Sequence, residues 1–353
     1  MVVNANGTAP GPPGGDLWTR PGAGIVRLMR VPPVLAAPQS ARLRVVVALV
    51  PCLLGLFIAG LYLAYMQTGQ SLAKPFQDAL WYQAAAVRLN LGHALYHLGP
   101  GDPPVLFVQG VTAPLLSPPP IAVIWRPIVL LPFGFAAWMV ACWLAVLGTT
   151  FYLVYRTGLP GALVATILAP AIGEQLAAGN VAAFFPLLMV MAWKLRDREL
   201  AGLAVGFMAV TKLSPASLGG WLLGTRRWRA VVAAALTVAV ILAISVIGAG
   251  WSSFTDYLDV ARTTAPSTAS LSGLTGIGWL SEGVLVVGTM VAVALGRWPR
   301  WAFILAVVVS IIGTPSLYLS GWVALLAILA PFCDRPAAVP AVAVGATPAV
   351  TLA

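Results

Sequence analysis

Long stretches without a charged residue constrain this chain more than any other feature. The run 230–249 contains no Asp, Glu, Lys or Arg, and similar runs recur along a sequence that is 60% hydrophobic and 8% charged. About 20 apolar residues span the hydrocarbon core of a bilayer as an α-helix. Because the runs lack the period-two alternation of barrel strands, the sequence predicts an all-α, polytopic transmembrane bundle.

The apolar runs indicate about 9–11 membrane segments. They lie near residues 42–66, 134–155, 160–173, 181–194, 199–211, 213–224, 230–249, 279–296, 301–313 and 316–333. Several are too short to cross a bilayer as straight α-helices, so we expect extended, tilted or broken helices among them. The run 119–133 is short and interrupted by Pro and Arg, which favours a re-entrant or interfacial segment on the outer side.

The ends of the chain differ in composition from its centre. Residues 1–40 are rich in Gly, Pro and Ala with scattered Arg, and residues 334–353 have the same character. Neither segment has the apolar content to build a core. We therefore expect a disordered tail at each end, both cytoplasmic, and one membrane domain over 41–333.

Basic residues set the predicted orientation, because cytoplasmic loops of membrane proteins carry an excess of Lys and Arg. Clusters occur before residue 45 and at 194–198, 226–229 and 297–300. Such clusters between apolar runs indicate topology, not nucleic-acid binding, despite the net charge of +10. They predict a cytoplasmic N-terminus, and we expect a multi-pass protein of the plasma membrane. The segments expected outside are 67–118, 174–180, 211–215, 250–278 and 314–320.

Asp78 is one of only ten acidic residues in the chain. It begins an amphipathic stretch in which Tyr82, Ala85, Leu89 and Tyr96 recur at helical spacing, so one face can approach the bundle. A carboxylate at the membrane edge is costly unless it has a function. Asp78 is therefore a candidate catalytic residue, with helix capping as the alternative.

Two other outer segments carry candidate polar residues. Lys212 has about a dozen apolar residues on both sides, and a lysine in such a place needs an anion. That anion is either a substrate phosphate or an acid of the outer face in a structural ion pair. Glu174, Gln175 and Asn180 belong to a polar turn, whose alternative interpretation is a plain helix–helix turn capped by Gly179.

The sequence gives little support for a metal site or for redox chemistry. His93 and His97 are four residues apart, but no third His or Cys accompanies them, so they are better interpreted as solvated loop residues. The three cysteines fall in different apolar runs without disulfide or metal spacing. We expect no metal and no cofactor.

Taken in order, these segments resemble the polyprenol-phosphate-sugar-dependent glycosyltransferases of family 87, in the membrane-embedded C superfamily. The resemblance covers about residues 70 to 330. Two positions depart from the family pattern: Leu116-Ser117 replaces part of a Tyr-Pro-Pro motif, and Ser316-Leu317-Tyr318 stands where many members carry a histidine. The matching residues are Asp78, Tyr82, Ala85, Gly92, Leu95-Tyr96, Pro118-Pro119, Pro127, Leu131-Pro132, Gly179-Asn180, 201–203, 212–215, 226–229, 270–273 and Thr314-Pro315.

The resemblance implies an inverting transfer of a hexose or pentose, with mannose favoured, from a polyprenyl-phosphate donor to a lipid or glycan acceptor on the outer face. Asp78 would be the general base, and Lys212 with Arg126 would bind the donor phosphate. The implied partners are these substrates and membrane lipids, without nucleic acid. Substrate binding is expected of Tyr82, Glu174, Gln175, Asn180, Ser272 and Tyr318.

Two alternatives remain at this point, a lipid or glycan transporter and a non-catalytic membrane assembly partner. A transporter usually places its lone charges near mid-membrane on broken helices and often shows internal repeats. The polar residues of this chain are instead predicted on one face, which favours an enzyme reached from that side.

Overall fold

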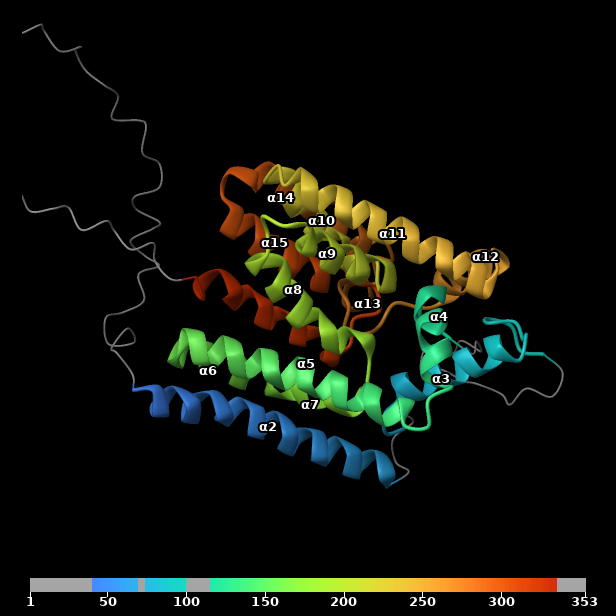
Figure 1. The fold of residues 1–353 in the computed structure, drawn as a ribbon, viewed down its shortest axis with the longest axis horizontal. Helices are drawn as coiled ribbons and strands as arrows, with labels where there is room; N and C mark the ends of the chain where they lie inside the picture. The colour runs from blue at the N-terminus through green and yellow to red at the C-terminus, as the bar shows by residue number, and fades with distance from the viewer. Residues whose placement is uncertain (1–39, 69–73, 100–114, 335–353) are drawn as a thin grey trace, which may run out of the picture. The chain divides into compact units, whose positions relative to one another are not determined.

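The computed structural model describes residues 40–68, 74–99 and 115–334, and every regular element in these ranges is a helix (Figure 1). The predicted tails, 1–40 and 334–353, fall outside the described residues except for Ser40 and Asp334.

Within the described ranges, four helices are long and apolar enough to cross a membrane, and a bent pair makes a fifth candidate span. This confirms the predicted all-α polytopic bundle, while the number of 9–11 segments stays a prediction. The spans are α2 (Ala41–Gln67), α5 (Gly134–Thr157), α11 (Trp228–Ala249) and α14 (Leu280–Ala294), which the 3₁₀-helix η4 (Leu295–Arg297) extends; the bent pair is α6 (Leu159–Ile167) and α7 (Ala169–Ala178).

The break between α6 and α7 has a local cause. The two helices meet at 57° around Leu168, and Pro170 in the first turn of α7 has no N–H to continue the hydrogen bonds of α6. Since α7 runs to Ala178, Glu174 and Gln175 are helical. The polar turn predicted over 174–180 is therefore wrong in extent, and only Gly179 and Asn180 form it.

The remaining apolar segments are shorter. Among them, η5 keeps 3₁₀ geometry for 14 residues; at a rise of about 2.0 Å per residue it covers ~28 Å, close to the thickness of a bilayer core. The segments are η2 (Val181–Phe184), α8 (Phe185–Lys194), α9 (Glu199–Thr211), η3 (Ser214–Ala216), α10 (Ser217–Gly224), α15 (Pro299–Ile312) and η5 (Leu319–Phe332).

Three helices gather at one end of the described body: α3 (Gln77–Asn90), α4 (Pro119–Ile128) and α12 (Ser252–Thr263) (Figure 1). At 10 residues, α4 is too short to cross a bilayer, in keeping with the interfacial segment predicted at 119–133. The outer segment 250–278 is more regular than expected, because it contains α12 and the short α13 (Leu271–Thr275).

Small residues allow close packing between helices. Gly202 and Gly206, one turn apart on α9, face α11, where a Cβ on Gly202 would overlap the carbonyl oxygen of Ala230. Such pairs of small residues let membrane helices approach and gain dispersion contacts.

The outward face of α11 is an apolar stripe. Its large side chains recur every three or four residues and are more than half exposed: Val232, Leu236, Val240, Ile244 and Ile247. In water such a surface would drive association, so the stripe is explained by contact with lipid.

Candidate active site

The backbone before α3 directs Asp78 toward the bundle. Phe76 has a left-handed conformation (φ 57°), and its N–H donates to the carbonyl of Ala177 at the end of α7 (2.8 Å). Asp78 lies in the first turn of α3, yet the N-terminus of this helix has no side-chain cap. The capping alternative for Asp78 is therefore wrong.

Asp78 instead meets the turn after α7. Its Oδ2 accepts a hydrogen bond from Nδ2 of Asn180 (2.7 Å). The amide of Asn180 has a fixed orientation, because its Oδ1 accepts the N–H of Ala182 (2.8 Å) and caps η2. The carbonyl of Asn180 also accepts from Nε2 of Gln175 (2.9 Å). The side-chain N–H of Asn180 is thus held in place against one carboxylate oxygen of Asp78.

Gly179 makes this approach possible. It ends α7 with φ 69°, as the capping alternative for this turn predicts, and its carbonyl accepts from Nε1 of Trp138 (2.9 Å). A Cβ here would lie 2.6 Å from Sδ of Met139 and 2.9 Å from Cβ of Ala79. Only glycine fits both the conformation and the space.

An aromatic cluster supports the site from within. The ring of Trp125 lies 6.2 Å from that of Tyr82 and 5.0 Å from that of Trp138. Tyr82, predicted to bind substrate, is only 1% exposed, and burial raises the pKa of its hydroxyl. In this structure its ring anchors α3 in the core.

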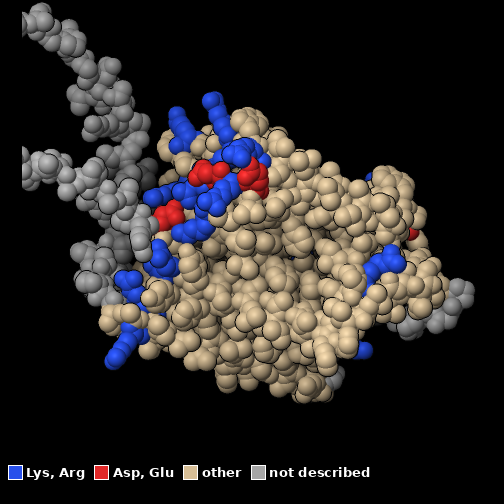
Figure 2. Space-filling view, viewed as in Figure 1, with Lys and Arg blue, Asp and Glu red and all other residues tan. Residues whose placement is uncertain are grey.

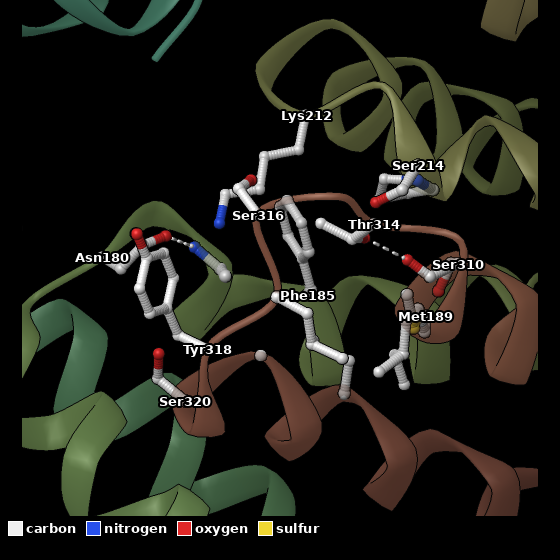
Figure 3. A pocket seen from close by; sticks show the side chains of 16 residues that line it. Asn180, Phe185, Met189, Lys212, Ser214, Ser310, Thr314, Ser316, Tyr318 and Ser320 are labelled. Carbon is white, nitrogen blue, oxygen red and sulfur yellow. Dashed lines mark hydrogen bonds between the residues drawn. The ribbon is translucent and has the colours of Figure 1, made fainter. Parts of the chain in front are cut away.

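Lys212 follows the last residue of α9 in an extended conformation and lines a small pocket of about 40 Å³. Its side chain reaches across the pocket toward Asn180 and Tyr318 (Figure 3). It forms no hydrogen bond or ion pair of 4 Å or less with another described residue. An ammonium without such a partner beside a pocket is suited to binding an anion.

The charge state of Asp78 reflects opposing influences. Burial raises the pKa of its carboxyl, whereas the hydrogen bond from Asn180 and the positive charge of Lys212 act to lower it. The two neighbours therefore favour the ionised form against the cost of desolvation. An aspartate in this environment is suited to accept a proton.

Tyr318 and Glu174 complete the group. Burial and the nearby carboxylates of Asp78 and Glu174 raise the pKa of Tyr318 to about 12, so its hydroxyl stays protonated and can donate. Glu174 accepts from the backbone of Ser320, and its Oε2 has no hydrogen-bond partner among the described residues. The group comes from four separate parts of the chain, which contribute Asp78, Glu174 with Asn180, Lys212 and Tyr318.

Three predicted site residues lie elsewhere. Arg126 donates through Nε to Oδ1 of Asn90 (2.7 Å) and through a terminal nitrogen to the carbonyl of Gly248 (2.8 Å), joining α4 to the ends of α3 and α11. Ser272 shares a hydrogen bond with Ser281 (3.1 Å) between α13 and α14. Gln175 is fully buried and supports the turn. None of the three lines the pocket, and neither do Asp78, Tyr82 and Glu174. The predicted site residues that line it are Asn180, Lys212 and Tyr318.

Several hydroxyl groups that were not predicted as site residues also line the pocket, three of them (Ser214, Thr314 and Ser316) in segments that were compared with the family pattern. They are contributed by the polar interruptions at the ends of apolar runs, which was the available signal. These residues are Ser214, Ser310, Thr314, Ser316 and Ser320 (Figure 3).

Comparison with known families is decisive for identity. The model of glycosyltransferase family 87 matches residues 116–353. The chain belongs to glycosyltransferase family 87. This confirms the family expected from the sequence and with it the glycosyltransferase class. The family 87 match includes Asn180, Lys212 and Tyr318, while Asp78 lies before its first residue.

One curated relative is similar over part of its length. It is the polyprenol-phosphate-mannose-dependent alpha-(1-2)-phosphatidylinositol pentamannoside mannosyltransferase of Mycolicibacterium smegmatis, 30% identical over 171 residues. The match covers 45% of this family 87 chain and 42% of the relative, so it spans less than half of either protein. No solved structure matches the chain.

Proposed function

We propose that this protein transfers a sugar, with mannose favoured, from a polyprenyl-phosphate donor to a lipid or glycan acceptor, with inversion at the anomeric carbon. The observation that carries the proposal is that Asn180, which lines the pocket together with the unpaired Lys212, holds the carboxylate of Asp78, whose charge Lys212 influences. It supplies a proton acceptor and a fixed cation together.

In the reaction, Asp78 takes the proton from an acceptor hydroxyl as that oxygen attacks the anomeric carbon. A new glycosidic C–O bond forms, and the bond between the anomeric carbon and the phosphate oxygen breaks. The electron pair of that bond leaves with the polyprenyl phosphate. Since the leaving group is already a stabilised anion, the reaction requires no strong general acid.

Lys212 stabilises the charge that develops on the leaving phosphate, and the protonated hydroxyl of Tyr318 donates beside it. Fixed donors and cations act strongly where water is excluded. The pocket has room for only a few waters at about 40 Å³. We therefore expect the sugar to lie at its mouth, where Asp78 and Lys212 can both reach the reacting atoms.

Two further observations support the proposed sugar donor and the side of the membrane on which the site lies. The name of the Mycolicibacterium smegmatis relative specifies polyprenol-phosphate-mannose as its donor. The basic clusters at 194–198, 226–229 and 297–300 favour a cytoplasmic location for their end of the bundle. We therefore propose that the site faces the outside of the plasma membrane.

The test is Asp78→Asn in the purified full chain, measuring transfer of mannose from polyprenyl-phosphate mannose. Asn keeps the shape and loses the proton acceptor, so we expect turnover to fall by about 10²–10⁴-fold. Asp256→Asn is the matched control, because Asp256 lies 3.4 Å from His97 and does not line the pocket.

Near-normal turnover in Asp78→Asn would refute the role of this residue as the base. If the wild-type protein moves polyprenyl-phosphate mannose across the bilayer of a vesicle without breaking the sugar–phosphate bond, the chain is a transporter. If it neither moves nor cleaves donors, the assembly-partner alternative gains support.

A further inference from the structure

A second hollow lies at the basic end of the described body, away from the proposed active site. It has a volume of about 370 Å³ and is formed by the turn between α8 and α9 and the turn between α10 and α11. Figure 2 shows Lys and Arg side chains concentrated at one end, with few acidic groups among them. Its charged lining is Arg196, Asp197, Arg226, Arg227 and Arg229.

Two of these arginines are held in place by the protein. Arg227 is only 16% exposed, pairs with Asp197 and lies 5.8 Å from the ring centre of Trp221. Arg196 lies 4.5 Å from the ring centre of Trp193 and donates to its carbonyl. A guanidinium has five N–H donors, so each retains donors for a ligand while its position is already fixed.

Arg226 is different, because it is exposed and forms no side-chain hydrogen bond or ion pair with another described residue. Its backbone is left-handed (φ 57°) at the point where the chain leaves α10. The N–H groups of Arg226 and Arg227 donate to the carbonyls of Leu223 and Leu222, respectively. This is the position at a helix end where glycine is preferred. An arginine there lowers stability, which suggests that its charge has a use.

The surroundings of the hollow are apolar. Trp228, the first residue of α11, is 60% exposed, and Leu223 is 42% exposed. Tryptophan is typical of the membrane–water interface, and the lipid-facing stripe of α11 continues from this point. Exposed Trp and Leu beside a basic hollow are the composition expected where lipid headgroups meet acyl chains.

We propose that this hollow binds the phosphate group of an anionic membrane lipid. Arginine forks match the oxygens of a phosphate in two parallel hydrogen bonds, and basic pockets beside membrane helices bind anionic headgroups. Arg196, Arg227 and Arg229 pair with Asp334, Asp197 and Glu199. Arg226 is therefore the cation of the lining whose charge a phosphate would balance. The apolar neighbours Leu223 and Trp228 favour a lipid over a free ion.

The experiment measures binding of short-chain phosphatidylglycerol to the purified full chain in neutral detergent by native mass spectrometry. The key variant is Arg226→Gly, which removes the guanidinium and puts the preferred residue into the left-handed position. We expect it to melt at the same or a higher temperature and to bind at least about tenfold more weakly, as for a lost hydrogen bond to a charged group.

Arg300→Gln is the matched control, since Arg300 is an exposed cation in the first turn of α15 and does not line the hollow. We expect it to change binding less than about twofold. An equal loss in both variants would reduce the hollow to a non-specific basic surface and overturn the proposal.

Two further arms identify the ligand source. Zwitterionic phosphatidylcholine carries a phosphate without net charge, and equally tight binding of this lipid would overturn the anionic specificity. Inorganic phosphate that displaces phosphatidylglycerol with equal affinity would overturn the assignment to a lipid. Weak competition by both supports the proposed headgroup site.

Discussion

Asp78 and Lys212 influence each other's charge without forming an ion pair. A closed pair would neutralise both groups and leave neither for a substrate. Held apart, the carboxylate can accept a proton while the ammonium faces a phosphate. Two opposite charges that are buried but not in contact gain less Coulomb energy than they lose in desolvation. The separation of Asp78 and Lys212 therefore costs stability and serves the proposed reaction.

Replacing Lys212 by Met tests the role of its charge, because Met keeps the length and the apolar contacts. We expect the fold to be retained and the Kd for polyprenyl-phosphate mannose to rise by about tenfold or more, the loss of a charged hydrogen bond. Arg should restore binding only in part, since a fork replaces a compact ammonium.

Lys74→Met is the control for Lys212→Met, because Lys74 is exposed and does not line the pocket. Unchanged donor affinity together with a collapse in thermal stability would show that Lys212 has a structural role, most directly toward Asp78 or Glu174.

The pH dependence of kcat/KM tests the hydrogen bond from Asn180 to Asp78. The base works only when ionised, so activity falls as pH drops through its pKa, which burial raises above the ordinary aspartate value of about 3.9. Removing the donor of Asn180 removes an influence that lowers this pKa. We therefore expect the acid limb of the pH profile to move to higher pH in Asn180→Ser.

The choice of Ser separates this effect from capping, because its hydroxyl can still accept the N–H of Ala182. Asn180→Asp should move the limb further, since a second carboxylate opposes ionisation of Asp78. An acid limb that stays in place in both variants would remove Asn180 from the proposed mechanism and leave it as a helix cap.

Among the elements, the turn between α7 and η2 controls how closely α3 approaches. Gly179→Ala adds a Cβ that contacts Met139 and Ala79 and places it in a left-handed backbone. We expect a loss of about 1–3 kcal/mol in unfolding free energy and reduced turnover, as α3 shifts away from Asn180. Thermal melting and transfer assays measure the two effects.

Gly219→Ala is the matched control, because Gly219 lies within α10 and a Cβ there meets nothing within 4 Å. Alanine in a helix should leave stability equal or higher. If Gly179→Ala behaves like this control, the turn does not set the approach of α3.

The long helices could be predicted from the sequence because lipid demands continuous apolar runs, and α2, α5 and α11 begin and end within about two residues of their predicted ranges. The break at Leu168 was harder to place, since Pro170 lies inside a run that remains apolar on both sides. The 3₁₀ geometry of η5 has no sequence pattern of its own and depends on packing.

The site was predictable only in part. Lys212 was conspicuous because it interrupts apolar sequence, and Asn180 because it follows a helix-ending glycine. Which of the polar residues meet at one pocket depends on packing between distant helices, which periodicity does not reveal. Arg126 looked equally available in the sequence, yet Asn90 and Gly248 occupy its guanidinium.

At the scale of the whole molecule, the orientation in the membrane is the main prediction. Single cysteines at His97 and Arg198 report it, and the background is low because Cys52, Cys142 and Cys333 are buried. We expect a membrane-impermeant thiol reagent to label His97→Cys from outside and Arg198→Cys only after the membrane is opened. Labelling in the reverse order would place the proposed site in the cytoplasm.

The proposed site joins Asp78, on α3, to Tyr318, just before η5 and 240 residues later. At a synthesis rate of about 5–20 residues per second, the interval between them is on the order of tens of seconds. Asn180 and Lys212 are synthesised within that interval, whereas Tyr318 is synthesised only at its end. Insertion of the final segment is therefore the step that completes the proposed site, and a nascent chain stalled before it would lack Tyr318 beside Asp78 and Lys212.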